Sequence, residues 1–249
     1  MKCFVVNLDR DVVRLGETRA MFASAGVEFE RVVAVDACAT PTKDLRSFCP
    51  QVRFYIANAR RVVPGEIGCA LSHIKAWNAI VARGLPLAAV FEDDVLADMS
   101  KLKEHFADIE ATNDPSVPTV WLMNRGLPKP KRLCGLWYEM RTADGRWGVD
   151  KPWAFGAYCY VLNTAAAKRL AELLTPMANV CDAWSTYARC GVRILAAADA
   201  FATTRPGLSA IAHRKSALWH FSLYRHFYWL RYRFAFRADL LMKRLEGKR

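Results

Sequence analysis

Three consecutive acids, Glu92, Asp93 and Asp94, directly follow an apolar run at Leu87–Phe91. Carboxylates held this close repel one another, and a divalent cation among them offsets that repulsion. Oxygen ligands favour Mg²⁺ or Mn²⁺ over softer metals. The segment FEDDV therefore predicts a divalent-cation site, and a solvated turn with helix-capping acids is the alternative.

The elements that must position these acids alternate between strand-like and helix-like patterns, which predicts a three-layer α/β fold with a mostly parallel sheet. The carboxyl ends of strands form the ligand crevice of such sheets, and the acids fall there. Residues 37–63 are expected to be irregular, and residues 133–149 to form a hairpin or loop. Strands are predicted at Lys2–Asn7, Val27–Val35, Leu87–Phe91, Thr119–Met123, Tyr158–Leu162 and Arg193–Ala198, and helices at Val12–Ala25, between Pro64 and Gly84, at Met99–Ala111 and at Thr164–Leu174.

The composition, with 53% hydrophobic and 24% charged residues, indicates a globular protein. The formal net charge is +12, and the last 36 residues hold ten Lys or Arg against two acids. This imbalance separates a globular domain at residues 1–213 from a basic tail at 214–249.

The start of the chain lacks the pattern of a secretory signal, and no apolar run is long enough to span a membrane, so a cytoplasmic location is expected. The eight cysteines contain no C-x-x-C pair, which argues against a zinc ribbon or a redox dithiol. Buried thiols are expected, and Cys69 is interpreted as a packing residue.

The tail interleaves aromatic residues with arginines and histidines between Ala217 and Met242. This pattern suits a helix on an anionic membrane surface, where rings bury and cations meet headgroups. A terminal helix that covers the core is the alternative. Binding to single-stranded nucleic acid would use the same residue types, but no RNA-binding motif accompanies them, so no nucleic-acid partner is expected.

The chain resembles the family 25 glycosyltransferases, which include lipooligosaccharide galactosyltransferases, from the first strand to at least Asp182. Four blocks match in order and spacing, and two later echoes are weaker. The four are FVVNLDRDVVR at Phe4–Arg14, FERVVAVDA at Phe29–Ala37, PGEIGCALSHIKAWNAIV at Pro64–Val81 and VFEDDV at Val90–Val95, and the echoes are FGAYCYVLNTAAAKRL at Phe155–Leu170 and VCDAW at Val180–Trp184.

The resemblance implies a GT-A-like domain over residues 1–213 and a UDP-hexose donor such as UDP-galactose. It also implies inversion at the anomeric carbon and a lipid-linked saccharide acceptor of lipooligosaccharide or lipopolysaccharide. A cation that bridges the donor phosphates would stabilise the charge of the leaving group. Asp94 is the first choice for its ligand, while Glu92 or Asp93 would complete the shell or contact ribose.

Donor contacts are expected from residues that follow the first two strands. Asn7, Arg10 and Arg14 come after the first, where a nucleotide would lie, and guanidinium groups pair well with phosphate. Asp36 ends the next strand and suits a base or ribose contact. Arg14 as a surface residue and Asp36 as a turn aspartate are the alternatives.

His73 is interpreted through the motif GEIGCALSH as a donor-binding or pocket-shaping residue, with Glu66 on the same helical stripe. A structural histidine is the alternative.

An inverting transfer needs a base to take the acceptor proton, and Asp182 is the candidate, although VCDAW lacks the proline-valine usual before this aspartate. An acceptor or metal contact and a structural role remain open for Asp182. Trp184 is expected to stack on the acceptor, and Tyr158 and Tyr160 to line its cleft, with core packing as the alternative for both tyrosines.

Two other functional classes compete with a transferase at the inner face of the cytoplasmic membrane. The first is a basic peripheral membrane or nucleic-acid-binding protein without catalysis. The second is another nucleotide-sugar enzyme, such as a hydrolase or a nucleotidyltransferase.

Overall fold

The computed structural model describes residues 1–58, 60–123, 132–139, 156–199 and 201–205. The predicted tail at 214–249 and its boundary with the domain lie outside these residues. Within the described ranges, no helix is both long and apolar enough to cross a membrane.

The described chain combines strands and helices, as expected, but they do not alternate strictly. The strands are β1 (Lys2–Asn7), β2 (Glu30–Val33), β3 (Leu87–Glu92), β4 (Val95–Ala97), β5 (Thr119–Leu122), β6 (Arg132–Cys134), β7 (Trp137–Glu139), β8 (Cys159–Asn163), β9 (Arg193–Ala197) and β10 (Ala202–Thr204). The helices are α1 (Val12–Ser24), α2 (Thr42–Phe48), α3 (Gln51–Asn58), α4 (Pro64–Ala82), α5 (Met99–Thr112), α6 (Thr164–Leu174) and α7 (Trp184–Arg189).

One eight-stranded sheet forms the middle layer, in the order β2-β1-β3-β8-β5-β9-β7-β6. The pairings of β1 with β2, β1 with β3 and β5 with β9 are parallel. Strand β8 runs antiparallel to both β3 and β5, and β7 antiparallel to β9 and β6. Only β8 and β7 therefore oppose the common direction, which confirms a mostly parallel sheet. A separate ribbon pairs β10 with β4.

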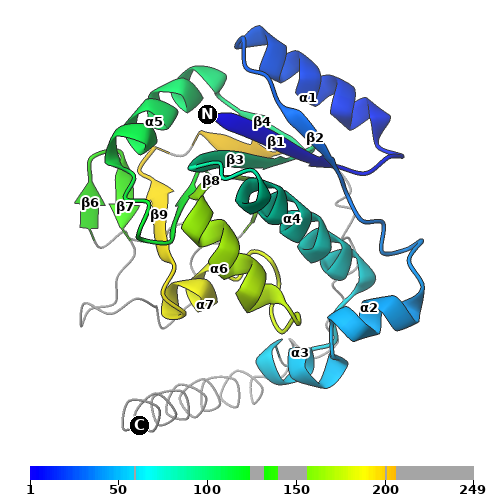
Figure 1. The fold of residues 1–249 in the computed structure, drawn as a ribbon. Helices are drawn as coiled ribbons and strands as arrows, with labels where there is room; N and C mark the ends of the chain where they lie inside the picture. Colours follow the sequence, from blue (N-terminus) through cyan, green and yellow to red (C-terminus); the bar gives the residue numbers. More distant parts are fainter. Residues whose placement is uncertain (59, 124–131, 140–155, 200, 206–249) are drawn as a thin grey trace, which may run out of the picture.

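Helices cover both faces of the sheet, as Figure 1 shows. Helices α1 and α5 bury Phe22, Leu102 and Ile109 against one face. Helices α4, α6 and α7 cover the other face, where Trp77, Leu170 and Trp184 are among the core residues. The apolar alternation of a central strand such as β3 explains this division, because Val90 faces one cluster and Phe91 the other.

Helix α4 approaches the chain after β2 at Gly68. A Cβ at this position would lie 2.6 Å from the Val35 carbonyl oxygen, so only glycine permits the contact. One turn later the Val35 amide donates to Ser72 Oγ at 2.8 Å, and Ser72 Oγ donates to the Gly68 carbonyl at 2.6 Å. This close packing fixes the height of Cys69 and His73 over the sheet.

Several predicted elements differ from the structure. The stretch expected to be irregular at residues 37–63 contains α2 and α3, whose buried Leu45 and Phe54 join the core. Strands β4 and β10 and helix α7 were not predicted, because each is too short to show a periodicity. The helix predicted at Thr164–Leu174 is observed as α6, and its capping side chain is that of Asn163, which accepts from the Ala166 amide.

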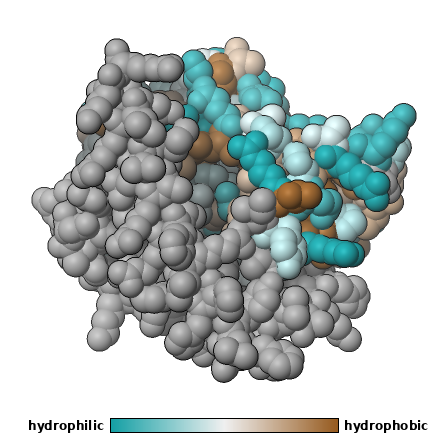
Figure 2. Space-filling view, turned by 90° about the horizontal axis from the view of Figure 1, so that it is seen from below, coloured by the Kyte–Doolittle hydropathy of each residue, from teal (hydrophilic) through white to brown (hydrophobic). Residues whose placement is uncertain are grey.

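The surface seen in Figure 2 is mostly hydrophilic where the structure describes it, with small apolar patches. Among the exposed apolar side chains are Val52 and Tyr55 on α3, and Val12 and Val13 at the start of α1. They are few and scattered, as expected for the surface of a folded domain.

Candidate functional site

The three acids lie at the carboxyl end of β3, but they do not form one cluster. Glu92 is directed to the α4 face, where His73 Nε2 lies 3.2 Å from Glu92 Oε1. Asp93 is directed to the α1 face, where Asn7 Nδ2 donates to it at 2.6 Å. Strand alternation explains the division, and the predicted single cluster of three carboxylates is therefore resolved into two neighbouring environments.

Asp93 is buried and bound by residues of β1 and α1. Besides the bond from Asn7, Arg14 Nη1 lies 3.6 Å from Asp93 Oδ1, and Thr18 Oγ1 donates to the Asp93 carbonyl at 3.0 Å. Burial raises the pKa of Asp93, while the bond from Asn7 and the charge of Arg14 oppose this rise. Asp93 thus connects the β3 terminus to α1.

Asp94 has the least satisfied carboxylate of the three. Within the described residues, its buried Oδ1 has no hydrogen-bond partner. Burial, followed by the charges of Glu92 and Asp93, raises the pKa of Asp94 to about 6. Its carbonyl accepts from the Arg205 amide at 2.7 Å, so the backbone is fixed while the side chain retains an open acceptor. A buried acceptor without a donor is costly, and a cation would remove this cost.

Glu92 is held by a buried polar chain that begins on α4. His73 has no exposed surface, and its Nδ1 lies 2.7 Å from Tyr160 Oη on β8. Trp77 Nε1 also donates to Tyr160 Oη, at 2.8 Å. His73 is therefore a buried link that orients Glu92, rather than a residue that itself reaches out to a phosphate.

The protonation of His73 follows from these neighbours. Burial opposes the charged imidazolium, but hydrogen bonds and charges from Cys69 and Glu92 outweigh burial and raise the pKa of His73 to about 10. Glu66, which was expected on the same helical stripe as His73, has a different role. Arg60 donates to both of its carboxylate oxygens, at 2.8 and 2.6 Å, and the Val63 amide donates at 3.1 Å, so Glu66 stabilises the start of α4.

Two cysteines meet beside Glu92. Cys69 Sγ lies 3.3 Å from Cys181 Sγ and 3.9 Å from Glu92 Oε1. The hydrogen bond with Cys181, together with burial, raises the pKa of Cys69 well above its usual value. Cys69 is thus more than the packing residue expected from the sequence, and the pair joins segments 112 positions apart.

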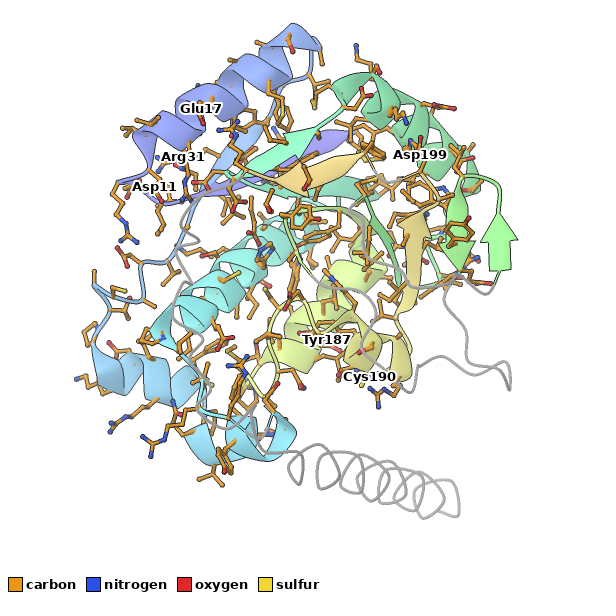
Figure 3. The ribbon with its side chains drawn as sticks, turned by 180° about the vertical axis from the view of Figure 1, so that it is seen from behind. Asp11, Glu17, Arg31, Tyr187, Cys190 and Asp199 are labelled. Atoms are coloured by element: carbon orange, nitrogen blue, oxygen red, sulfur yellow. The ribbon has the colours of Figure 1, made fainter. Side chains whose placement is uncertain are left out.

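The predicted donor residues after β1 and β2 lie together at one sheet edge. Asn7 is fully engaged, because it donates to Asp93 and to the Asp11 carbonyl and accepts from Arg31 Nε at 2.9 Å. Arg31, which sequence reasoning missed, also donates to Asp9 at 2.6 Å. Figure 3 shows Arg31 and Asp11 near the start of α1. Asn7 is therefore a positioning residue in this structure.

Arg10 and Asp36 form an ion pair across the loops that follow β1 and β2. Asp36 Oδ1 also accepts from the Cys38 amide at 3.0 Å, as expected for a turn aspartate. Both roles considered for Asp36 therefore remain compatible with its place. The arginine is about half exposed, so a phosphate can compete with Asp36 for its guanidinium.

Asp182 lies next to Cys181 and is oriented by a backbone bond. The Gly156 amide donates to Asp182 Oδ2 at 2.9 Å, and Trp184 Nε1 donates to the Gly156 carbonyl at 3.0 Å. Through the contact of Cys181 with Cys69, Asp182 belongs to the same region as Glu92. The candidate base and the acids of β3, far apart in sequence, are thus brought to one end of the sheet.

The predicted acceptor contacts fit the structure less well. Trp184 and Tyr160 have no exposed surface, and their rings pack edge to face with centroids 5.3 Å apart. Because Trp184 is buried, it is not placed to stack on a sugar, and Tyr160 is not placed to line an open cleft. Core packing, which was the alternative for Tyr160, describes both side chains. Tyr158 packs against the opposite core cluster, so the two tyrosines do not share a face. The chain bends at Tyr158, one residue before β8 begins, so the alternation of a strand does not extend to this residue.

The residues at the β3 terminus fit a hard divalent cation. The fit rests on the unpartnered Oδ1 of Asp94 and on carboxylate oxygens as the available ligands. Glu92 is the second candidate ligand, because its side chain is partly exposed at 27%. Asp93 is less suited, since Asn7 and Arg14 already occupy its oxygens.

Comparison with known proteins gives a family match for the first half of the chain. Residues 1–123 match the family model described as "Glycosyltransferase family 25 (LPS biosynthesis protein)". Three curated relatives share shorter segments: the human "Inactive glycosyltransferase 25 family member 3", 42% identical over 57 residues and 22% of this chain; the Drosophila melanogaster "Glycosyltransferase 25 family member", 32% over 99 residues and 38%; and the human "Procollagen galactosyltransferase 2", 33% over 96 residues and 37%.

The matched segments cover only 10%, 16% and 15% of these relatives' own lengths. Solved structures are more distant. A UDP-glucose pyrophosphorylase complexed with UDP-glucose aligns over 79% of this chain and 89% of its own, at a TM-score of 0.40 and 14% identity. A mannose-1-phosphate geranyltransferase from Thermus thermophilus aligns over 79% of this chain and 74% of its own, at a TM-score of 0.40 and 13% identity. Neither structural likeness bears on function at this level.

The matched range includes Asn7, Arg14, His73 and all three acids of β3, the residues that the structure gathers at one end of the sheet. This chain therefore carries a glycosyltransferase family 25 domain over residues 1–123.

Proposed function

We propose that this chain is a metal-dependent, inverting glycosyltransferase with a GT-A-like domain. It transfers a hexose, galactose from UDP-galactose, to a saccharide acceptor of lipooligosaccharide or lipopolysaccharide. The family 25 domain and a relative named as a galactosyltransferase support the reaction class. Relatives named inactive show that the domain alone does not guarantee catalysis, so the proposal depends on the residues present here.

The observation that carries the proposal is the open carboxylate of Asp94. Its buried Oδ1 has no partner among the described residues, and burial, followed by the charges of Glu92 and Asp93, raises the pKa of Asp94. Asp93 has partners within the fold, but the buried Oδ1 of Asp94 has none among the described residues, and an unsatisfied acceptor of this kind is costly without a ligand.

In this proposal Asp94 and Glu92 hold Mn²⁺ or Mg²⁺. When bound, the cation neutralises charge that develops on the diphosphate leaving group. Arg10 and Arg14 lie beyond β1 and bind the donor phosphates, with Arg10 released from Asp36 for that purpose. Asp36 then binds ribose or base. Asn7 and Asp93 keep the loop after β1 and the β3 terminus at a fixed separation.

Asp182 acts as the general base. The bond from the Gly156 amide orients its carboxylate, which takes the proton of the acceptor hydroxyl as that oxygen bonds to the anomeric carbon. The bond from the sugar to the nucleoside diphosphate breaks in the same step, and the diphosphate departs with its electron pair. His73 holds Glu92 in place and has no part in the proton transfer.

The acceptor is lipid-linked in this proposal, and the protein works at the inner face of the cytoplasmic membrane. The basic aromatic tail at 214–249 supports this location through its composition. Docking to an anionic surface raises the local concentration of an anchored acceptor.

The test is a thermal shift with a panel of UDP-, GDP- and CMP-sugars, each with and without Mn²⁺. Wild-type protein is expected to show a Mn²⁺-dependent shift with a UDP-hexose, and Asp94→Ala to lose it. Asp44→Asn, on the exposed surface of α2, is the matched control and keeps the shift. If Asp94→Ala shows a Mn²⁺-dependent thermal shift as large as that of wild-type protein, the metal assignment is wrong.

Product analysis then separates transfer from other nucleotide-sugar chemistry. With a saccharide acceptor, wild-type protein is expected to form a glycoside of inverted configuration, and Asp182→Asn to bind donor normally but to lose turnover. Release of free sugar regardless of acceptor indicates a hydrolase instead. Donor binding without any product indicates a non-catalytic member of the family.

A further inference from the structure

Two thiols, one imidazole and one carboxylate converge on the α4 face beside β3. Cys69 and His73 come from consecutive turns of α4, Cys181 from the segment before α7, and Glu92 from the end of β3. The ligand atoms of Cys69, His73 and Cys181 all lie within 4.8 Å of one another. Glu92 Oε1 lies 3.2 Å from His73 Nε2 and 3.9 Å from Cys69 Sγ.

We infer that Cys69, Cys181 and His73 form a binding site for a soft divalent metal, Zn²⁺, with Glu92 as the fourth ligand. Tetrahedral zinc with Zn–S near 2.3 Å and Zn–N near 2.0 Å separates its ligand atoms by roughly 3.3–3.8 Å. The sulfur atoms are 3.3 Å apart, so binding requires only a small movement.

The surroundings of His73 match those of a metal-ligating histidine. Its Nδ1 lies 2.7 Å from Tyr160 Oη, which leaves Nε2 directed toward Glu92. Ligating histidines commonly bond through their second nitrogen to a fixed partner, which sets the tautomer. Trp77 donates to the same phenol oxygen at 2.8 Å and fixes Tyr160. The imidazole is therefore already oriented for a ligand at Nε2.

The donor set separates this site from the one at Asp94. Two thiolates and an imidazole select zinc over Mg²⁺ or Mn²⁺, which prefer carboxylate oxygens. Glu92 is a candidate ligand for both sites. With zinc at the cysteines it would be held on the α4 face, and Asp94 would remain as the carboxylate of the other site. The inference needs no sugar donor and does not depend on the proposed transferase activity.

The site is accessible and its proton balance is simple. Cys69 is half-buried and the Glu92 side chain is 27% exposed, while His73 and Cys181 lie deeper. Binding of Zn²⁺ would release three protons to solvent, two from the thiols and one from the His73 imidazolium, and would leave two thiolates and a neutral imidazole on the metal. The other buried cysteines, such as Cys159, have no such set of partners within the described residues.

The test uses the full-length chain, reduced, stripped of metal and loaded with Zn²⁺ alone or with Co²⁺ as a spectroscopic probe. Wild-type protein is expected to retain about one zinc per chain after gel filtration and to gain thermal stability. With Co²⁺ it is expected to show the near-ultraviolet thiolate-to-cobalt band that oxygen ligands do not produce.

Cys69→Ser and Cys181→Ser are expected to lose the cobalt band and to bind zinc at least tenfold more weakly. Cys159→Ser is the matched control, because it places a hydroxyl at a buried cysteine, as Cys181→Ser does, but in the core cluster on the other side of the sheet. It is expected to retain both the band and the zinc. Where a serine variant folds poorly, protection of Cys69 and Cys181 from alkylation by Zn²⁺ in wild-type protein gives the same answer.

Three results would overturn the inference. One is wild-type protein that, when reduced, binds no zinc above the level of Cys69→Ser. Another is a cobalt spectrum without the thiolate band. The third is mass spectrometry that finds Cys69 and Cys181 joined as a disulfide in air and unprotected by Zn²⁺ after reduction, which would make the pair a redox couple instead.

Discussion

Adjacent acids of the same type have different chemistry here because strand geometry places them in different surroundings. Asp93 receives a bond from Asn7 and the charge of Arg14, whereas Asp94 has an unpartnered buried oxygen within the described residues. The difference is one of partners more than of burial, and it is the reason for which Asp94, rather than Asp93, is the proposed cation ligand.

The raised pKa of Asp94 predicts how Asp94→Asn changes stability with pH. The Asp94 carboxyl has a pKa of 3.8 in the unfolded chain and about 6 in the folded protein. Ionisation of this group therefore destabilises the folded state, and the stability present when the group is protonated is lost as the pH rises through about 6. Asparagine does not ionise. In EDTA at pH 8 the variant is expected to be more stable than wild type by about 1–2 kcal/mol, a value reduced for solvent screening.

Urea denaturation at a series of pH values measures this effect. The difference should shrink as pH falls through about 6 and vanish below 3.8, where both proteins carry an uncharged group. Asp44→Asn, on the surface, should show a much smaller change. An Asp94→Asn variant less stable than wild type at pH 8 would mean that the carboxylate has a partner in solution.

At the scale of elements, α4 is the main positioning device of the site. Its start is fixed by the pair of Arg60 with Glu66 and its second turn by the approach at Gly68, and its inner face carries Cys69 and His73. Packing and hydrogen bonding thus account for five residues of the matching motif GEIGCALSH: Glu66, Gly68, Cys69, Ser72 and His73.

Gly68→Ala is expected to destabilise the protein by about 1–3 kcal/mol, because the new methyl group would meet the Val35 carbonyl oxygen at 2.6 Å. Gly16→Ala in α1 is the matched control. A Cβ at Gly16 meets nothing within 4 Å, so alanine should stabilise α1 by about 0.5–1 kcal/mol. Thermal denaturation of both variants measures the contrast, and equal effects would refute the packing argument.

Arg60→Ala is expected to destabilise the protein by about 2–3 kcal/mol, because Glu66, with 1% of its side chain exposed, would lose its paired cation. Arg83→Ala is the comparison, since Arg83 pairs in the same bidentate way with Glu30 but both side chains are well exposed. Its effect should be clearly smaller. Chemical denaturation measures the loss of stability in each variant. A larger loss for Arg83→Ala would contradict the role given to the pair of Arg60 with Glu66.

At the scale of the molecule, two apolar layers on either side of the sheet pack distant segments together. Buried hydrogen bonds also join distant segments, and Asn163 at the end of β8 makes several of them. Its oxygen accepts from the amides of Thr119 and Ala166, and its nitrogen donates to Asn113 Oδ1 and to the carbonyls of Asp114 and Val117. One buried amide thus joins the sheet, α6 and the chain that enters β5.

Asn163→Ala is expected to cost about 2–4 kcal/mol, because it leaves several buried backbone groups without partners. Ser116→Ala removes the exposed bond from the Ser116 hydroxyl to Asp114 in the same loop and keeps the bond from the Ser116 amide, so it should cost far less. Calorimetry measures both. A loss of similar size in the two variants would show that the loop, rather than the buried amide, sets the stability.

Local pattern was sufficient for much of the fold. The apolar runs at β1, β3 and β8 and the helical spacing of α4 and α6 are long enough to reveal their periods, and the three acids follow β3 as predicted. Helices α2 and α3 and the short strands β4 and β10 were missed because they are defined by packing and pairing with remote segments.

The sequence by itself determined which residue types are available at the carboxyl end of β3, and its blocks identified the family. Only the tertiary structure decided which partners they meet. It separated Glu92 from Asp93, buried Trp184 and Tyr160, and joined Cys69 to Cys181 without any C-x-x-C spacing. The physical reason is that hydrogen bonds and metal ligation depend on distance in space, which sequence separation does not report across layers of a sheet.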